Sequence, residues 1–225
     1  MGASSLLSSG MCGELSRDQA QRVAAIERGA DELLQLIDST VTMARLDQGD
    51  GRSRFVVSDV GVGDLLIQIK GEFSDAFEKK GVTLVIDPVE PECLIKTDLI
   101  KLKEILRNLI ENARKFTQQG KVEVRFAPRE GEARVEFVVS DTGIGIAKDD
   151  LPKIFELFFQ AETSTVEHAS GGLGLNIVKR LVTAMSGEIT VDSEVGHGTA
   201  FHIYLPRALP TVHNSALSLR GFQNL

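Results

Sequence analysis

Apolar residues recur at alternating steps of three and four along the first part of the chain. The seam they form consists of Val23, Ile26, Ala30, Leu33, Ile37 and Ala44, with Thr40 in the remaining position. A 3.5-residue period is typical of helices that pack in coiled coils or bundles. Ser16 and Gln19 have the spacing of a capping box, so we expect the helix to begin there and to reach about Leu46. Such a helix needs a partner helix to bury its seam.

Beyond a linker at 50–54, the pattern changes to short apolar runs alternating with helical segments. The predicted strands are 54–60, 82–87, 93–97, 120–127 and 133–141, followed by a hairpin within 187–206. The predicted helices are 62–80, closed by Gly81, then 98–116, and a glycine-led helix that ends near Ser186. Mixed elements of this kind predict an α/β fold, a two-layer α/β sandwich preceded by a long bundle-type helix.

This pattern divides the chain into four parts. They are a helical region at 1–49, the linker at 50–54, an α/β domain at 55–206, and a tail at 207–225 without sustained periodicity, which we expect to be mobile. The stretch 141–170 is predicted to be irregular.

Composition narrows the class of protein. Hydrophobic residues make up 42% and charged residues 25%, as in soluble globular proteins, and the net charge of −7 argues against a general nucleic-acid binder. Cys12 and Cys93 lie far apart and predict neither a disulfide framework nor a zinc site. No apolar run approaches the ~20 residues of a membrane span. We therefore expect a cytoplasmic chain, or the cytoplasmic part of a larger protein.

The helix at 98–116 has two distinct faces. Its expected buried stripe is Leu102, Ile105, Leu106, Leu109, Ala113 and Phe116. Asn108, Asn112 and Lys115 share another face, which is either solvated or a site for Mg²⁺ and phosphate. Asparagine is a mediocre helix former, and a merely solvated position would favour Glu, Lys or Gln. The second interpretation explains the two asparagines better.

Asp141 follows a predicted strand directly and precedes Gly143 and Gly145. One interpretation is a plain turn with a capping carboxylate. The other is a pocket for a purine base, because a carboxylate accepts hydrogen bonds from an exocyclic amino group such as that of adenine. Guanine presents a carbonyl at that position and would be repelled, so one aspartate can select the nucleotide.

Gly172 and Gly174 stand at the start of the last predicted helix. Either the chain turns sharply there, or a group approaches the backbone closely, and free N–H groups at a helix N-terminus suit phosphates. Before them, Phe155, Phe158 and Phe159 either anchor a loop over a ligand or pack in the core.

In their order along the chain, five motifs resemble the N box, first glycine box, F box, and second and third glycine boxes of sensor histidine kinases. They read NLIENARKF, DTGIG, FELFF, GGLGL and GHGTAF. The resemblance covers roughly residues 55–206 and implies the Bergerat fold of the gyrase/MutL-type ATPase superfamily. Residues 23–50 are similar to the second helix of the family's dimerization and histidine-phosphotransfer hairpin.

The resemblance also implies roles for single residues. Asn112 would coordinate Mg²⁺ with Asn108 assisting at the phosphates, Lys115 would contact phosphate, and Phe116 would flank the adenine of ATP. The remaining implied cofactor-binding residues are Asp141 at the adenine amino group, Gly143 and Gly145 along the pocket, Gly172, Leu173 and Gly174 at the helix below the phosphates, and Thr199 in support of the base pocket.

One departure from the family concerns the phosphate acceptor, which lies in a pattern like H-E-L-R-T-P-L. The histidines of this chain are His168, His197, His202 and His213, and none has that setting. Residues 1–10 resemble the end of the first hairpin helix, so we expect the acceptor to be absent. Ser170 stands where the second glycine box usually has glycine.

The leading hypothesis is therefore the ATP-binding catalytic core of a two-component sensor histidine kinase that does not label itself alone. The implied partners are a second copy, through the helical hairpin of the parent protein, and the receiver domain of a response regulator. We expect dimerization of this chain to be weak. Two alternatives remain, a degenerate nucleotide-binding regulatory module and a relative that phosphorylates serine, which the bundle helix disfavours.

Overall fold

The computed structural model describes residues 55–90, 93–129, 133–159 and 172–209, with Leu7, Gly13, 15–26, 29–30 and Ile37 of the N-terminal region. The predicted linker, most of the seam beyond Ala30 and the tail beyond Leu209 lie outside the described residues. In the part of the chain that is described, no helix has the length and apolar character to cross a bilayer.

The beginning of the N-terminal helix is as predicted. The Ser16 backbone N–H donates to Gln19 Oε1 at 2.9 Å, and the Gln19 N–H donates to Ser16 Oγ at 3.3 Å. This reciprocal pair is a capping box, and residues 17–26 are helical. The seam residue Ile26 is 64% exposed in the single chain, which agrees with a seam that needs a partner helix.

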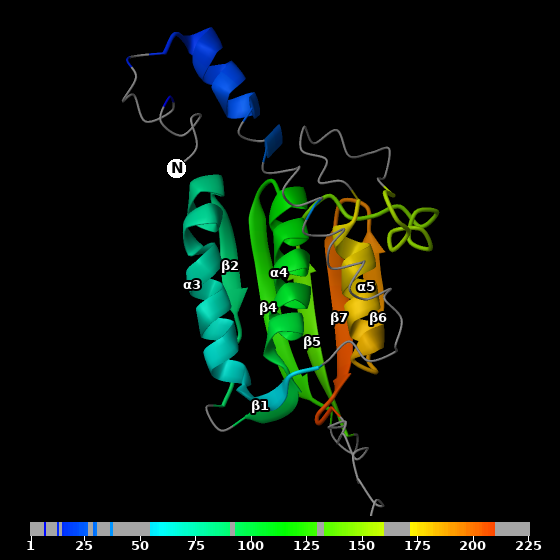
Figure 1. The fold of residues 1–225 in the computed structure, drawn as a ribbon. Coiled ribbons are helices and arrows are strands. Elements are labelled where there is room, and N and C mark those ends of the chain that lie inside the picture. The colour runs from blue at the N-terminus through cyan, green and yellow to red at the C-terminus, as the bar shows by residue number, and fades with distance from the viewer. Residues whose placement is uncertain are drawn as a thin grey trace, which may run out of the picture.

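The α/β domain has two layers, a five-stranded sheet and three helices that cover one of its faces (Figure 1). The strand order is β2 (Val82–Ile86), β4 (Gly120–Pro128), β5 (Arg134–Asp141), β7 (Gly198–Pro206) and β6 (Glu188–Glu194). The helices are α3 (Val62–Lys80), α4 (Leu99–Phe116) and α5 (Gly174–Ala184). β2 and β4 are parallel, and the other neighbours are antiparallel. The predicted two-layer α/β sandwich is confirmed.

A second, two-stranded sheet joins β1 (Val57–Gly61) to β3 (Leu94–Asp98) in antiparallel pairing. The chain after β7 returns to it, since the Lys96 N–H donates to the Arg207 carbonyl at 2.9 Å and the Leu209 N–H donates to the Lys96 carbonyl at 2.8 Å. Leu209 is 7% exposed. Residues 207–209 therefore pack onto the domain that we had expected to end at Pro206.

Helix α4 shows how local sequence produces the layer. Asp98 caps its N-terminus by accepting a hydrogen bond from the Lys101 N–H at 3.1 Å. Its buried residues are Leu102, Ile105, Leu106, Leu109, Ile110 and Ala113. Phe116 is only half-buried, so its assignment to the buried stripe was wrong and Ile110 takes part instead. The ring of Phe116 is thereby available at the end of the helix.

Candidate functional site

Asp141 ends β5 and lies directly opposite Thr199, the second residue of β7. Directly opposed residues of antiparallel strands place their side chains on the same face of the sheet. Asp141 follows the inward-facing Val139, so this is the face that the helices cover. Thr199 is 8% exposed, and Asp141 Oδ1 accepts a hydrogen bond from the Gly143 N–H at 2.8 Å.

Burial raises the pKa of the Asp141 carboxyl to about 6, against the opposing effect of hydrogen bonds from the backbone N–H groups of Gly143 and Thr199. Desolvation disfavours the charged form of a carboxyl, whereas N–H donors favour it. The carboxyl group is therefore mostly ionised near pH 7 and becomes mostly protonated about two pH units lower. An ionised carboxylate here is a pure hydrogen-bond acceptor.

The loop after Asp141 is packed between α4 and the β6–β7 turn. The Ile144 N–H donates to the Phe116 carbonyl at 3.2 Å, and the Gly196 N–H donates to the Ile144 carbonyl at 2.8 Å. Gly145 has a φ of +69°, and a Cβ there would lie 2.0 Å from the Glu194 carbonyl oxygen. A Cβ on Gly143 would lie 2.4 Å from the Phe116 carbonyl oxygen. Glycine is therefore needed at both positions because the protein's own backbone occupies the space that a Cβ would take.

The asparagine face of α4 meets the first residue of α5. A Cβ on Gly174 would lie 3.0 Å from Asn108 Oδ1 and 3.9 Å from Asn112 Nδ2. Asn108 Nδ2 donates to the Glu104 carbonyl at 2.9 Å, which fixes the orientation of its amide. Leu173 precedes α5 as its buried N-cap residue, and within the described ranges no side chain caps this N-terminus. The structure therefore brings two amide side chains to an uncapped helix N-terminus.

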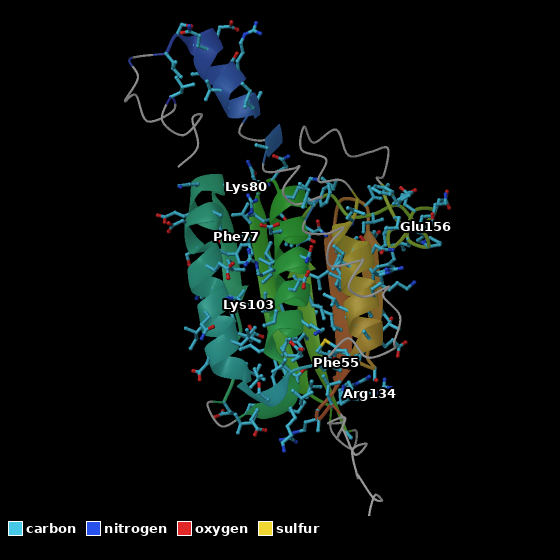
Figure 2. The ribbon with its side chains drawn as sticks, viewed as in Figure 1. Phe55, Phe77, Lys80, Lys103, Arg134 and Glu156 are labelled. Atoms are coloured by element: carbon cyan, nitrogen blue, oxygen red, sulfur yellow. The ribbon has the colours of Figure 1, made fainter. Side chains whose placement is uncertain are left out.

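Lys115 and Phe116 follow Asn112 by one helical turn and form the C-terminal end of α4. Lys115 Nζ lies 5.0 Å from the centre of the Phe116 ring. Lys80 lies at the end of α3 (Figure 2). Its Nζ donates to the carbonyl oxygens of Arg114 and Lys115, the latter at 2.9 Å. A cation at a helix C-terminus satisfies free carbonyls and interacts favourably with the helix dipole. The sequence analysis did not identify this role of Lys80. The available signal was its place as a basic residue in the last turn of α3.

The three phenylalanines of the F box differ in their burial. Phe155 and Phe159 pack against the core, and the Phe155 ring contacts that of Phe201 edge-on at 6.5 Å between centres. Phe158 is 67% exposed and has a left-handed backbone, with φ of 61°. Its N–H donates to the Gly172 carbonyl at 3.2 Å.

Gly172 is required where it stands for two reasons. Its φ is +65°, and a Cβ would lie 2.7 Å from the carbonyl carbon of Phe158. Both the sharp turn and the close approach that the sequence left open are therefore present. The approaching group in this structure is the protein backbone.

A second residue that we had missed is Ser193, in β6. Its Oγ accepts a hydrogen bond from the Ile146 N–H at 2.8 Å and lies 2.8 Å from Thr199 Oγ1. It connects the loop after Asp141 to the strand that carries Thr199. No local pattern marks such a serine, because its partners are distant in the sequence.

The family model described as histidine kinase-, DNA gyrase B-, and HSP90-like ATPase matches residues 97–209 of the chain. The match contains α4, the Asp141 loop, α5 and Thr199 in the order given above. The chain belongs to this ATPase family. Its α/β domain is an ATPase domain of the sensor histidine kinase type, as its relatives show.

Two relatives of this ATPase domain are long sensor proteins. Autoinducer 2 sensor kinase/phosphatase LuxQ of Vibrio cholerae is 37% identical over 196 residues, which cover 85% of this chain and 23% of LuxQ. Sensor histidine kinase GacS of Pseudomonas protegens is 34% identical over 216 residues, which cover 92% of this chain and 23% of GacS. The chain thus spans about a quarter of the length of these relatives.

Solved structures agree with the fold of the histidine kinase ATPases. Full-length ShkA in complex with AMPPNP has a TM-score of 0.69 and 31% identity, with 92% of this chain and 43% of ShkA covered. The catalytic domain of histidine kinase ThkA has a TM-score of 0.58 at 21% identity, with 68% of this chain and 96% of that domain covered. At that identity, the ThkA likeness concerns the fold alone.

Proposed function

We propose that this domain binds Mg-ATP and transfers the γ-phosphoryl group to a histidine of a phosphotransfer hairpin. The observation that carries the proposal is the placement of α4, whose two asparagines lie at the uncapped start of α5 and whose last residue, Phe116, accepts a hydrogen bond from the loop after Asp141. The carboxylate of Asp141 would accept a hydrogen bond from the adenine amino group, and Phe116 would flank the base. Family membership and the AMPPNP complex of ShkA support the choice of nucleotide.

The donor set near Gly174 fits a magnesium ion held chiefly by phosphates and water. Asn112 would provide an amide oxygen to the ion, and Asn108, with its amide nitrogen committed to Glu104, would turn its oxygen toward the same place. Neutral oxygen ligands suit Mg²⁺, which keeps several waters and binds substrate phosphates. When bound, the ion would neutralise charge on the transferring phosphoryl group.

The phosphates would lie between the N-terminus of α5 and Lys115. Free N–H groups at a helix start and a lysine ammonium both stabilise phosphate oxygens. In the transfer, a lone pair of an imidazole nitrogen would form the new bond to the γ-phosphorus. The bond to the bridging oxygen would break, and ADP would leave with that electron pair, so the protein contributes positioning and electrostatics.

The acceptor would be a histidine other than those of the described domain. His202 lies between the inward-facing Phe201 and Ile203 in β7. Its side chain therefore lies on the other face of the sheet from the side chain of Thr199. There its Nδ1 lies 2.8 Å from Glu136 Oε1. His197 lies exposed in the β6–β7 turn. A second copy of the chain and a response-regulator receiver domain are the partners that the sensor-kinase relatives suggest.

Calorimetric titration with ATP, with and without Mg²⁺, tests the site. Asn112→Ala should weaken Mg-dependent ATP affinity about tenfold or more, because an ion ligand is lost. The fold should persist by circular dichroism, and Gln118→Ala, at an exposed position just beyond α4, serves as the control. Unchanged affinity in Asn112→Ala would remove the metal assignment.

Adding a separate hairpin that carries the acceptor pattern then tests the transfer itself. An acid-labile phosphohistidine should appear on the added hairpin and not on this chain. Binding of ATP without any transfer would favour the regulatory nucleotide-binding module, and stable self-labelling of this chain would contradict the assignment of the acceptor.

A further inference from the structure

Ser193 lies at the centre of a compact hydrogen-bond cluster behind the proposed base site. Its Oγ accepts from the Ile146 N–H at 2.8 Å, donates to the Gly198 carbonyl at 2.9 Å, and lies 2.8 Å from Thr199 Oγ1. Ser193 and Thr199 are also directly opposed residues of β6 and β7. The three contacts reach the Asp141 loop, the β6–β7 turn and the strand that carries Thr199.

The number of protons in this cluster determines the direction of each hydrogen bond. A serine hydroxyl has one proton and two lone pairs. The Gly198 carbonyl has no proton, so the Ser193 proton must lie between these two oxygens. One lone pair of Ser193 receives the Ile146 N–H, which leaves one lone pair for the remaining contact. The Thr199 hydroxyl must therefore donate its proton to Ser193.

A Thr199 hydroxyl whose proton is committed to Ser193 offers only lone pairs to other groups. The neighbouring ionised Asp141 carboxylate, on the same sheet face, also offers only lone pairs. We propose that Ser193 is a positioning residue that holds the proton of Thr199 away from the bound base, so that Asp141 and Thr199 together accept hydrogen bonds and select a purine with an amino group. This inference rests on the proposed function and deepens it.

The inference predicts a specific discrimination between ATP and inosine triphosphate. The two bases differ at the exocyclic position, where adenine has an amino donor and hypoxanthine has a carbonyl acceptor, and at the adjacent ring nitrogen, which is an acceptor in adenine and carries a proton in hypoxanthine. In the proposed arrangement, both acceptors face the exocyclic position. Two fixed acceptors would favour the donor and repel the carbonyl, which is selection by an unfavourable contact with the wrong ligand. In Ser193→Ala, the Thr199 hydroxyl loses its acceptor and can turn to donate to the carbonyl.

The experiment measures dissociation constants of Mg-ATP and Mg-inosine triphosphate for the full chain and for variants. Ser193→Ala should lower the preference for ATP over inosine triphosphate about fivefold or more. Ser193→Thr keeps the hydroxyl and should retain most of the preference. Ser140→Ala, on the opposite face of β5, is the matched control and should leave the preference unchanged.

If Ser193 had a purely structural role, Ser193→Ala would lower the affinities for both nucleotides by the same factor. That result would overturn the inference. Should Ser193→Ala fail to fold, Thr199→Val provides the test, because loss of the hydroxyl oxygen should also lower the preference, and an unchanged ratio would contradict it. A wild-type chain that binds neither nucleotide would overturn the proposed function together with the inference. Binding of ATP with an unaltered ratio in the variants would overturn the inference alone.

Discussion

At the scale of the residue, Asp141 combines two opposing influences on one carboxyl group. Burial raises its pKa to about 6, and the N–H groups of Gly143 and Thr199 limit that rise. The cost of holding an ionised carboxylate in this place is recovered when a donor group binds to it. Nucleotide binding and pH are therefore linked through this side chain.

We predict that ATP affinity falls as the pH falls through about 6, because a protonated Asp141 carboxyl is a weaker acceptor than the carboxylate and carries an O–H donor that the amino group cannot accept. With a pKa of about 6, the ionised fraction at pH 5 is about one tenth, so affinity should drop about tenfold between pH 8 and pH 5. Titration calorimetry over this range is the measurement. Asp141→Asn should bind weakly with a flat profile, and a flat profile in the wild type would contradict the prediction.

The free protein should show the opposite trend in stability. A carboxyl whose pKa is raised by folding contributes stability at low pH that is lost as the pH rises through the folded value. The unfolding free energy of the wild type, relative to Asp141→Asn, should therefore decrease between about pH 5 and pH 7 in the absence of nucleotide.

At the scale of the element, the end of α4 depends on α3. Lys80 Nζ donates to the carbonyls of Arg114 and Lys115, while the next carbonyl, that of Phe116, accepts from Ile144. The pKa of Lys80 is lowered by burial and, secondly, by the nearby Arg114. The last turn of α4 is thus stabilised by hydrogen bonds from Lys80 of α3 and from Ile144 of the loop after Asp141.

Replacing Lys80 by methionine should uncouple the two helices while keeping the apolar stem of the side chain. We expect a loss of about 1–2 kcal/mol in unfolding free energy from the broken hydrogen bonds, measured by denaturant titration. ATP affinity should fall several-fold, because Lys115 and Phe116 lose their support. Lys79→Met, an exposed neighbour on the same turn, is the control, and equal effects of both variants would contradict this role.

The elements themselves were largely predictable, because local signals determine them. The helix expected over 98–116 is present with Asp98 as its N-cap, and Gly81 ends α3 in the left-handed conformation, as predicted. The reasons for the site glycines were not predictable. Gly145 is required by the carbonyl of Glu194, a contact between positions distant in the sequence, and no periodicity reveals such a contact. The same limit explains why Ser193 was missed.

At the scale of the whole molecule, the two sheets are joined by the chain that follows β7. Residues 207–209 hydrogen-bond to Lys96 of β3, so the end of the domain contacts the small sheet formed near its beginning. Long-range pairing of this kind contributes to cooperativity, because the segment that leaves β7 of the larger sheet also pairs with β3 of the smaller one.

Leu209→Ala should therefore destabilise the whole domain by about 2–3 kcal/mol, as expected for truncation of a buried leucine. Thermal or denaturant unfolding measures this loss. Leu94→Ala, in the same small sheet but 51% exposed, is the matched control and should cost less than about 1 kcal/mol. A loss in Leu209→Ala no larger than that in Leu94→Ala would contradict this role of the segment after Pro206.

The contact between Phe158 and Gly172 places the departure and the return of the intervening segment at one point of the domain. Closing a loop costs free energy that rises only slowly with its length, provided that its ends are already held together. Insertions or deletions between these two residues should consequently leave the position of α5 unchanged. Variation in that segment can then alter what the domain recognises without requiring the rest of the fold to adapt.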